Sequence, residues 1–117
     1  MYQELRRLGL TKYEAKMYQT LVEYGQLDAK AISKLSGVPQ TAVYPNVKSL
    51  QEKNLIQQFS GKIRAYQAIQ PRVAFPAFVE REKKKLLLLQ NDLVQQAELA
   101  LHKKEILPQK EVVQVSQ

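Results

Sequence analysis

Apolar residues recur at intervals of seven through the second half of this chain, and this spacing restricts the fold more than any other feature. The positions are Val79, Leu86, Leu93, Ala100 and Leu107. Such a repeat predicts one long helix with an apolar stripe, running from about residue 72 to residue 107. A domain of about 70 residues at one end of the helix cannot cover so long a stripe. We therefore expect the helix to pair with a second copy of the chain as a homodimer.

The expected dimer interface follows this stripe. Its members are Val79, Leu86, Leu89, Leu93, Ala97 and Ala100. The second heptad position, at 82, 89, 96 and 103, is mostly polar, which predicts a modest or partly splayed coiled coil. Pro76 predicts a kink or a later start of the helix, and Pro108 predicts its end. Residues 109–117 contain a strand-like pattern.

Two helices are predicted near the N-terminus from their caps. Thr11 and Glu14 have the spacing of a capping box, and the helix that follows is expected to close at Gly25 in the left-handed conformation. A short second helix is expected to start after Asp28, a good N-cap, and to end at Gly37.

A third helix and a hairpin follow a tight turn. The helix is expected to begin around residues 39–41 and to end at Asn54, with a core face made of Val43, Val47 and Leu50. The period then changes to two, which predicts strands at 55–59 and 63–69 joined by a turn at 60–62. This order is that of a winged helix-turn-helix. The predicted fold is therefore mostly α with a small β-hairpin, divided into a winged helix-turn-helix (1–70), a long dimerisation helix (71–107) and a short tail (108–117).

The charge distribution favours double-stranded DNA as the partner. The chain has 18 Lys and Arg against 11 Asp and Glu, a net charge of +7. Residues 28–69 carry a balance of +4, whereas residues 76–107 carry only +1, so the surplus lies where a DNA-binding surface is expected. The third helix can enter a major groove, and its N-terminal amides favour phosphate. The predicted DNA contacts are Lys30, Gln40, Thr41, Tyr44, Lys48, Lys62 and Arg64.

Several other classes of protein are not expected from the composition. The chain has no Cys and one His, so we expect no disulfide, no metal site, no cofactor and no enzyme activity. It has no apolar run long enough for a membrane span and no signal-peptide core, which predicts a cytoplasmic, nucleoid-associated protein. Two alternatives to a sequence-specific regulator stay open: an architectural, chromatin-like DNA-binding protein, and a winged helix that binds other proteins.

Five segments together resemble the N-terminal domain of the TrmB-type transcriptional regulators, a mainly archaeal family. They are LGLTKYEA (8–15), AISKLSGVP (31–39), VY (43–44), VKSLQEKNLI (47–56) and RAY (64–66). The resemblance covers roughly residues 5–107 and implies a winged-helix DNA reader followed by a dimerising helix. Full-length members carry a C-terminal sugar-binding domain, and this chain stops about where that domain would begin. The resemblance therefore implies either a DNA-binding-only member or a fragment of a longer regulator, and we expect no small-molecule effector for this chain. Pro45 departs from the family pattern, because it lies inside the expected third helix. It predicts that this helix starts late, at about Ala42, or bends.

Overall fold

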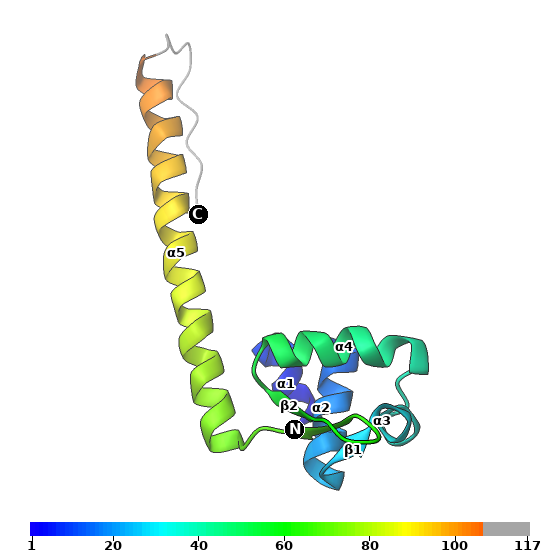
Figure 1. Cartoon of the computed structure of the whole chain (residues 1–117). Coiled ribbons are helices and arrows are strands. Elements are labelled where there is room, and N and C mark those ends of the chain that lie inside the picture. Colours follow the sequence, from blue (N-terminus) through cyan, green and yellow to red (C-terminus); the bar gives the residue numbers. More distant parts are fainter. Residues whose placement is uncertain (107–117) are drawn as a thin grey trace. The chain divides into compact units, whose positions relative to one another are not determined.

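The computed structural model of the chain describes residues 1–106, as five helices and three strands (Figure 1). It divides into two compact units, the first formed by Met1–Val79 and the second beginning at Glu80. The first unit extends to Val79 and so includes the first two turns of the last helix. The fold class predicted from the sequence, a winged helix-turn-helix with a long C-terminal helix, is confirmed.

The first unit opens with two helices, α1 (Tyr2–Leu8) and α2 (Lys12–Tyr24). Helix α1 was not expected from the sequence. The capping box of α2 is confirmed, because the Thr11 hydroxyl accepts from the Glu14 amide at 3.2 Å and the Glu14 carboxylate accepts from the Thr11 amide at 2.8 Å. Gly25 ends α2 with φ 84° and ψ −141°, so its predicted left-handed conformation is wrong. This backbone leads the chain directly into a strand.

The helix-turn-helix consists of α3 (Ala29–Ser36) and α4 (Gln40–Glu52). The Asp28 carboxylate caps α3 by accepting from the Ala31 amide at 2.8 Å, as predicted. The turn between the helices needs Gly37 at φ 77°, a left-handed conformation that glycine adopts without strain. Asn54 follows α4 with φ 56°, also as predicted.

Helix α4 contains Pro45 and nevertheless starts at Gln40. The predicted start at Ala42 is therefore wrong. Pro45 lacks the amide that would bond to the Thr41 carbonyl, but Thr41 is exposed, so water can take the place of that donor. The Asn46 side chain donates to the Ala42 carbonyl at 2.8 Å in the same turn. A bend at Pro45 stays a prediction.

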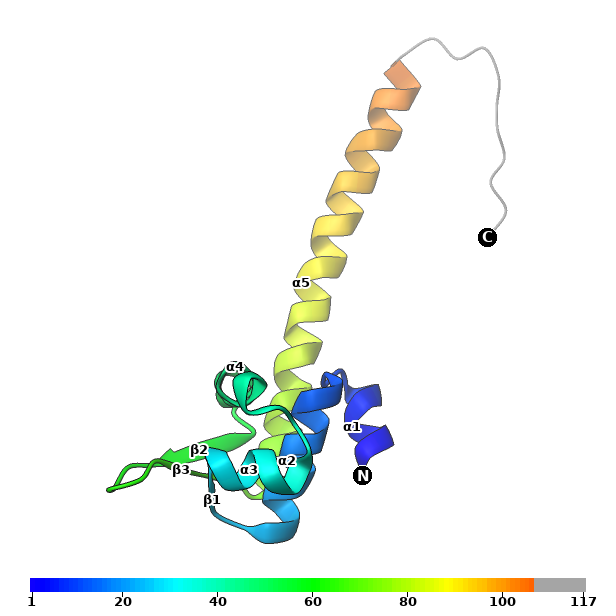
Figure 2. The ribbon, with the colours of Figure 1, turned by 90° about the vertical axis from the view of Figure 1, so that its right-hand side faces the viewer.

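A three-stranded antiparallel sheet in the order β1-β3-β2 completes the winged helix. Strands β2 (Ile56–Phe59) and β3 (Ala65–Ala68) form the expected hairpin, whose tip extends beyond the helices of this unit (Figure 2). Both strands are shorter than predicted, and Ile63 and Arg64 lie in the connection between them. The two-residue strand β1 (Leu27–Asp28), which pairs with Tyr66 and Ala65, was not predicted.

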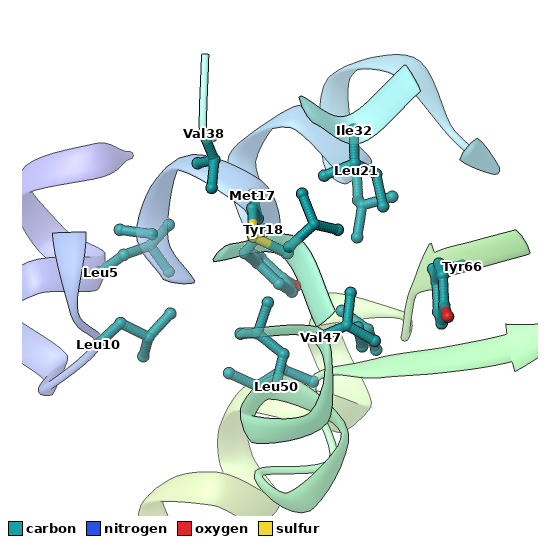
Figure 3. Close-up of a cluster of buried hydrophobic side chains, with 14 of the residues drawn as sticks. Leu5, Leu10, Met17, Tyr18, Leu21, Ile32, Val38, Val47, Leu50 and Tyr66 are labelled. Carbon is teal, nitrogen blue, oxygen red and sulfur yellow. The ribbon is translucent and has the colours of Figure 1, made fainter. Parts of the chain in front are cut away.

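The core of this unit gathers around Tyr18 of α2 (Figure 3). Helices α1, α3 and α4, strand β3 and the first turns of α5 all contribute to it. Val38, in the turn, is buried, whereas Leu35 of α3 is 42% exposed. The largest of the other fully buried apolar side chains are Leu10, Met17, Leu21, Ile32, Leu50, Leu55 and Tyr66.

Helix α5 (Pro71–Ile106) starts close to the expected residue 72 and includes Pro76. A later start at Pro76 is therefore wrong. Ala74 and Phe78 are buried in the core of the first unit. The predictions for Leu107, Pro108 and the segment 109–117 lie outside the described residues. Within the described part of the chain, no helix combines the length and apolarity needed to cross a membrane.

Candidate nucleic-acid interface

Helix α4 separates its buried residues from the residues predicted to contact DNA. Val43, Val47 and Leu50 are buried, as the sequence predicted. Gln40, Thr41, Tyr44 and Lys48 are all exposed, and Tyr44 keeps 56% of its surface accessible. Because Gln40, Tyr44 and Lys48 follow one another at intervals of four, they share one side of the helix. The helix therefore presents a continuous polar and aromatic face to solvent.

A groove of about 600 Å³ lies between this face and the hairpin. It brings together three of the predicted contacts, Tyr44 and Lys48 from α4 and Arg64 from the hairpin. The amide of Gln51 donates to the side-chain oxygen of Gln58 at 3.2 Å and so bridges α4 and β2. The groove is also lined by Pro45, Val47 and Tyr66.

Sequence reasoning missed Gln51 and Gln58 as members of this groove. Gln58 faces Tyr66 in the strand register, so its position depends on the pairing of β2 with β3. The sequence alone does not indicate which α4 residue a polar residue on an exposed strand face will contact.

The remaining predicted contacts lie outside the groove. Lys62 is exposed in the connection at the tip of the hairpin, and Lys30 is exposed in the first turn of α3. Gln40 and Thr41 occupy the first turn of α4, where no side chain caps the helix. Amide groups of this turn are therefore open to an acceptor from a ligand.

Lys53, which the charge balance counted with the basic surface, has a structural role instead. Its ammonium group lies 2.6 Å from the carboxylate of Glu14, which is 1% exposed. The Ser49 hydroxyl donates to the same carboxylate oxygen at 2.5 Å. Burial opposes the charge of Glu14, but the hydrogen bonds from Lys53, Ser49 and the Thr11 amide outweigh burial and lower the pKa of its carboxyl. This network fastens the start of α2 to the last turn of α4.

The second predicted site, the apolar stripe of α5, is exposed. Leu86, Leu89 and Leu93 keep 65%, 53% and 56% of their surface accessible. Val79, Ala97 and Ala100 are exposed as well. Further exposed large apolar residues of this helix were not part of the expected interface, namely Val73, Leu87, Leu88, Val94, Leu99 and Leu101.

The family described as the sugar-specific transcriptional regulator TrmB matches residues 5–72. The chain belongs to the TrmB family. This match confirms the resemblance inferred from the sequence, and it covers the winged helix-turn-helix and the first residues of α5.

Two relatives in the same family each align with 71 residues of the chain. Over 71 residues the chain is 37% identical to the HTH-type sugar sensing transcriptional regulator TrmBL1 of Pyrococcus furiosus, covering 61% of this chain and 21% of that protein. It is 31% identical over 71 residues to the DNA-binding HTH-type transcriptional repressor TrmBL2 of Thermococcus kodakarensis, covering 61% of this chain and 27% of that protein. The chain thus spans about a quarter of these relatives.

The likeness to a solved TrmB-family structure extends further along the chain. The structure of TrmBL2, described as an archaeal chromatin protein with a novel mode of DNA binding, has a TM-score of 0.83 at 25% identity. It covers 96% of this chain and 43% of that protein.

Proposed function

We propose that this TrmB-family chain is a transcriptional regulator that binds double-stranded DNA through helix α4 and the hairpin. The observation that carries the proposal is the groove in which Tyr44 and Lys48 of α4 meet Arg64 of the hairpin. A cation from each wall of a groove can neutralise phosphates of one DNA backbone, which is the main source of affinity for DNA. TrmBL2 of Thermococcus kodakarensis, a relative, is described as DNA-binding.

The exposed face of α4 would read the bases. Gln40 and Thr41 lie in the first turn and Tyr44 in the second. A glutamine can pair bidentately with adenine in the major groove, which gives about 1–3 kcal/mol of discrimination against other bases. Lys48, Lys62, Arg64 and Lys30 are assigned to the phosphate backbone.

We further propose that the chain acts as a homodimer on a palindromic operator. The exposed apolar stripe of α5 supports pairing with a second copy. Two winged helices joined in this way would read half-sites about 34–36 Å apart or at multiples of that distance. A protein of this kind would be associated with the nucleoid in the cytoplasm.

A second candidate is an architectural protein that coats DNA with little sequence preference. The similarity to TrmBL2, described as an archaeal chromatin protein, favours it. The two candidates differ in specificity, so titrations of Gln40→Ala on a selected operator and on random DNA separate them. For a regulator, the substitution reduces the preference for the operator, whereas for a coating protein both affinities change equally.

The DNA interface itself is tested by the salt dependence of binding. Lys62→Ala and Arg64→Ala should each weaken binding to every sequence. Each should also reduce the slope of log affinity against log salt, by up to about 0.9 for every phosphate that the removed cation had neutralised. Lys12→Ala is the control, because Lys12 is an exposed cation outside the proposed interface. It lies at the start of α2, two residues from Glu14, and Glu14 contacts the C-terminal end of α4.

The outcomes separate the proposed roles. An unchanged slope in the double variant of Lys62 and Arg64 would refute the role of the hairpin. No salt-sensitive binding to any duplex would favour a winged helix that binds proteins.

A further inference from the structure

A second surface of the first unit has no role in the proposed DNA interface. It is an apolar pocket of about 410 Å³ between α1 and the start of α5. Leu5, Leu8, Met1 and Phe75 line it together with Glu4. The ring of Phe75 packs edge-on against the buried Tyr18, with ring centroids 5.4 Å apart. The wall that Phe75 forms is therefore held in place by the core.

The polar groups at this pocket are already paired. Glu4 accepts from the N-terminal amine at 3.0 Å and from Arg7 at 3.2 Å. A pocket for a small polar ligand needs a few polar groups free to orient it, and Glu4 is occupied. The pocket therefore suits an apolar side chain.

The pocket shares Phe75 with helix α5. At about 100° per residue, Phe75 lies within about 40° of Val79 on the helix surface, and Val79 lies within about 20° of Leu86. Phe75 thus begins the stripe that Val79, Leu86 and Leu93 continue. Phe75 therefore belongs both to the lining of the pocket and to the start of the stripe.

We propose that this pocket is part of the dimer interface and that it accepts helix α5 of a second copy. The proposal rests on the proposed homodimer and adds α1 to it. An apolar stripe that runs from Phe75 to Ala100 needs an apolar partner of similar length, and among the described residues α5 is the helix that offers one. In a two-fold dimer each copy would offer its pocket to the other, so the contact occurs twice. Helix α1 then acts as a dimerisation element.

Cross-linking between copies tests this contact directly. The chain has no cysteine, so a cysteine introduced at one position is the only thiol. Glu4→Cys in one tagged chain and Val79→Cys in a differently tagged chain should be joined by a short bismaleimide reagent. Both side chains are accessible, at 64% and 37% exposure. Tyr24→Cys, at the equally accessible end of α2, should not be joined to Val79→Cys.

Sedimentation provides the second measurement. Leu8→Glu should raise the dimer dissociation constant at least tenfold, because it places a carboxylate in an apolar contact. Leu35→Glu is the matched control, since Leu35 is an exposed leucine on α3 and should leave the constant unchanged. If circular dichroism shows that Leu8→Glu is unfolded, the cross-link decides the question in chains that retain Leu8.

The outcomes separate this inference from the proposed dimer. A wild-type chain that is monomeric at tens of micromolar would refute the dimer and this contact together. A stable dimer with no cross-link between positions 4 and 79, and with no effect of Leu8→Glu in the folded protein, would refute the contact and leave the dimer standing.

Discussion

Replacing Glu14 by Gln tests whether the buried network of α2 and α4 stabilises the winged helix. The carboxylate accepts from Lys53 and Ser49 at one oxygen and from the Thr11 amide at the other. Hydrogen bonds to a charged group contribute about 1.5–3 kcal/mol each, and breaking a buried ion pair costs about 3–5 kcal/mol. The Lys53 side chain is 29% exposed and can reach water after the substitution. We therefore expect a loss near the lower end, about 3 kcal/mol of the free energy of unfolding.

This cost should depend on pH. The pKa of Glu14 lies below its ordinary value of 4.5 in the folded state. The stability that its charge contributes is therefore fully present above that value, and it is lost as the pH falls through the lower folded pKa. Protonated Glu14 resembles Gln, so the difference in stability between wild type and Glu14→Gln should shrink in acid.

Thermal and urea unfolding at a series of pH values measures both effects. A loss of about 3 kcal/mol corresponds to a melting temperature lower by roughly 12–24 °C in a domain of this size. Glu23→Gln is the control, because Glu23 is an exposed carboxylate on the same helix and should change stability by less than about 0.5 kcal/mol. A loss below about 1 kcal/mol at neutral pH, or a difference that does not change in acid, would refute this account of the network.

Three further predictions follow from the packing. Leu86→Lys with Leu93→Lys should give monomers with a folded winged helix and weaker operator binding, because burying each leucine in the proposed dimer is worth about 1.5–3 kcal/mol. Sedimentation and operator titration check this prediction. Tyr18→Phe should leave stability unchanged or raise it by up to about 1 kcal/mol, because the Tyr18 hydroxyl is buried with no hydrogen-bond partner among the described residues; a clear loss in urea unfolding would contradict this. Pro45→Ala should raise the melting temperature, because it restores an amide that can bond to the Thr41 carbonyl; an unchanged melting temperature would show that the proline costs α4 nothing.

The elements of the fold that were predicted correctly have local signals. The capping box at Thr11 and Glu14 and the N-cap at Asp28 each involve residues three apart, and the structure forms both. The elements that were missed lack such signals. Helix α1 has no side-chain cap at Met1, and β1 has two residues whose only strand-like property is their pairing with β3. Leu27 pairs with Tyr66 and Asp28 with Ala65, 39 and 37 positions away, and such pairing cannot be inferred from a pattern of two residues.

Glu14 shows why the roles of site residues were harder to predict than the helices. The capping box correctly predicted both hydrogen bonds between Glu14 and Thr11, but the other partners of the Glu14 carboxylate, Ser49 and Lys53, lie 35 and 39 positions away. Lys53 was therefore counted with the DNA-binding charge. Lys48, five positions earlier, is exposed and lines the groove with Arg64. Only the packing of α4 against α2 distinguishes these two lysines.

The same packing explains how the candidate interface can be held rigidly although its side chains are exposed. On α4, the buried Val47 is followed directly by the exposed Lys48, and on the hairpin the exposed Arg64 lies two positions before the buried Tyr66. Each charged residue therefore has its backbone fixed by a core residue beside it, while its own side chain stays free to reach a phosphate. In the proposed complex only the ends of these side chains would need to be ordered, which would limit the entropy lost on binding. The hydrogen bond from Gln51 to Gln58 further restrains the spacing of the two walls. The proposed DNA-binding groove is therefore already formed in the protein alone.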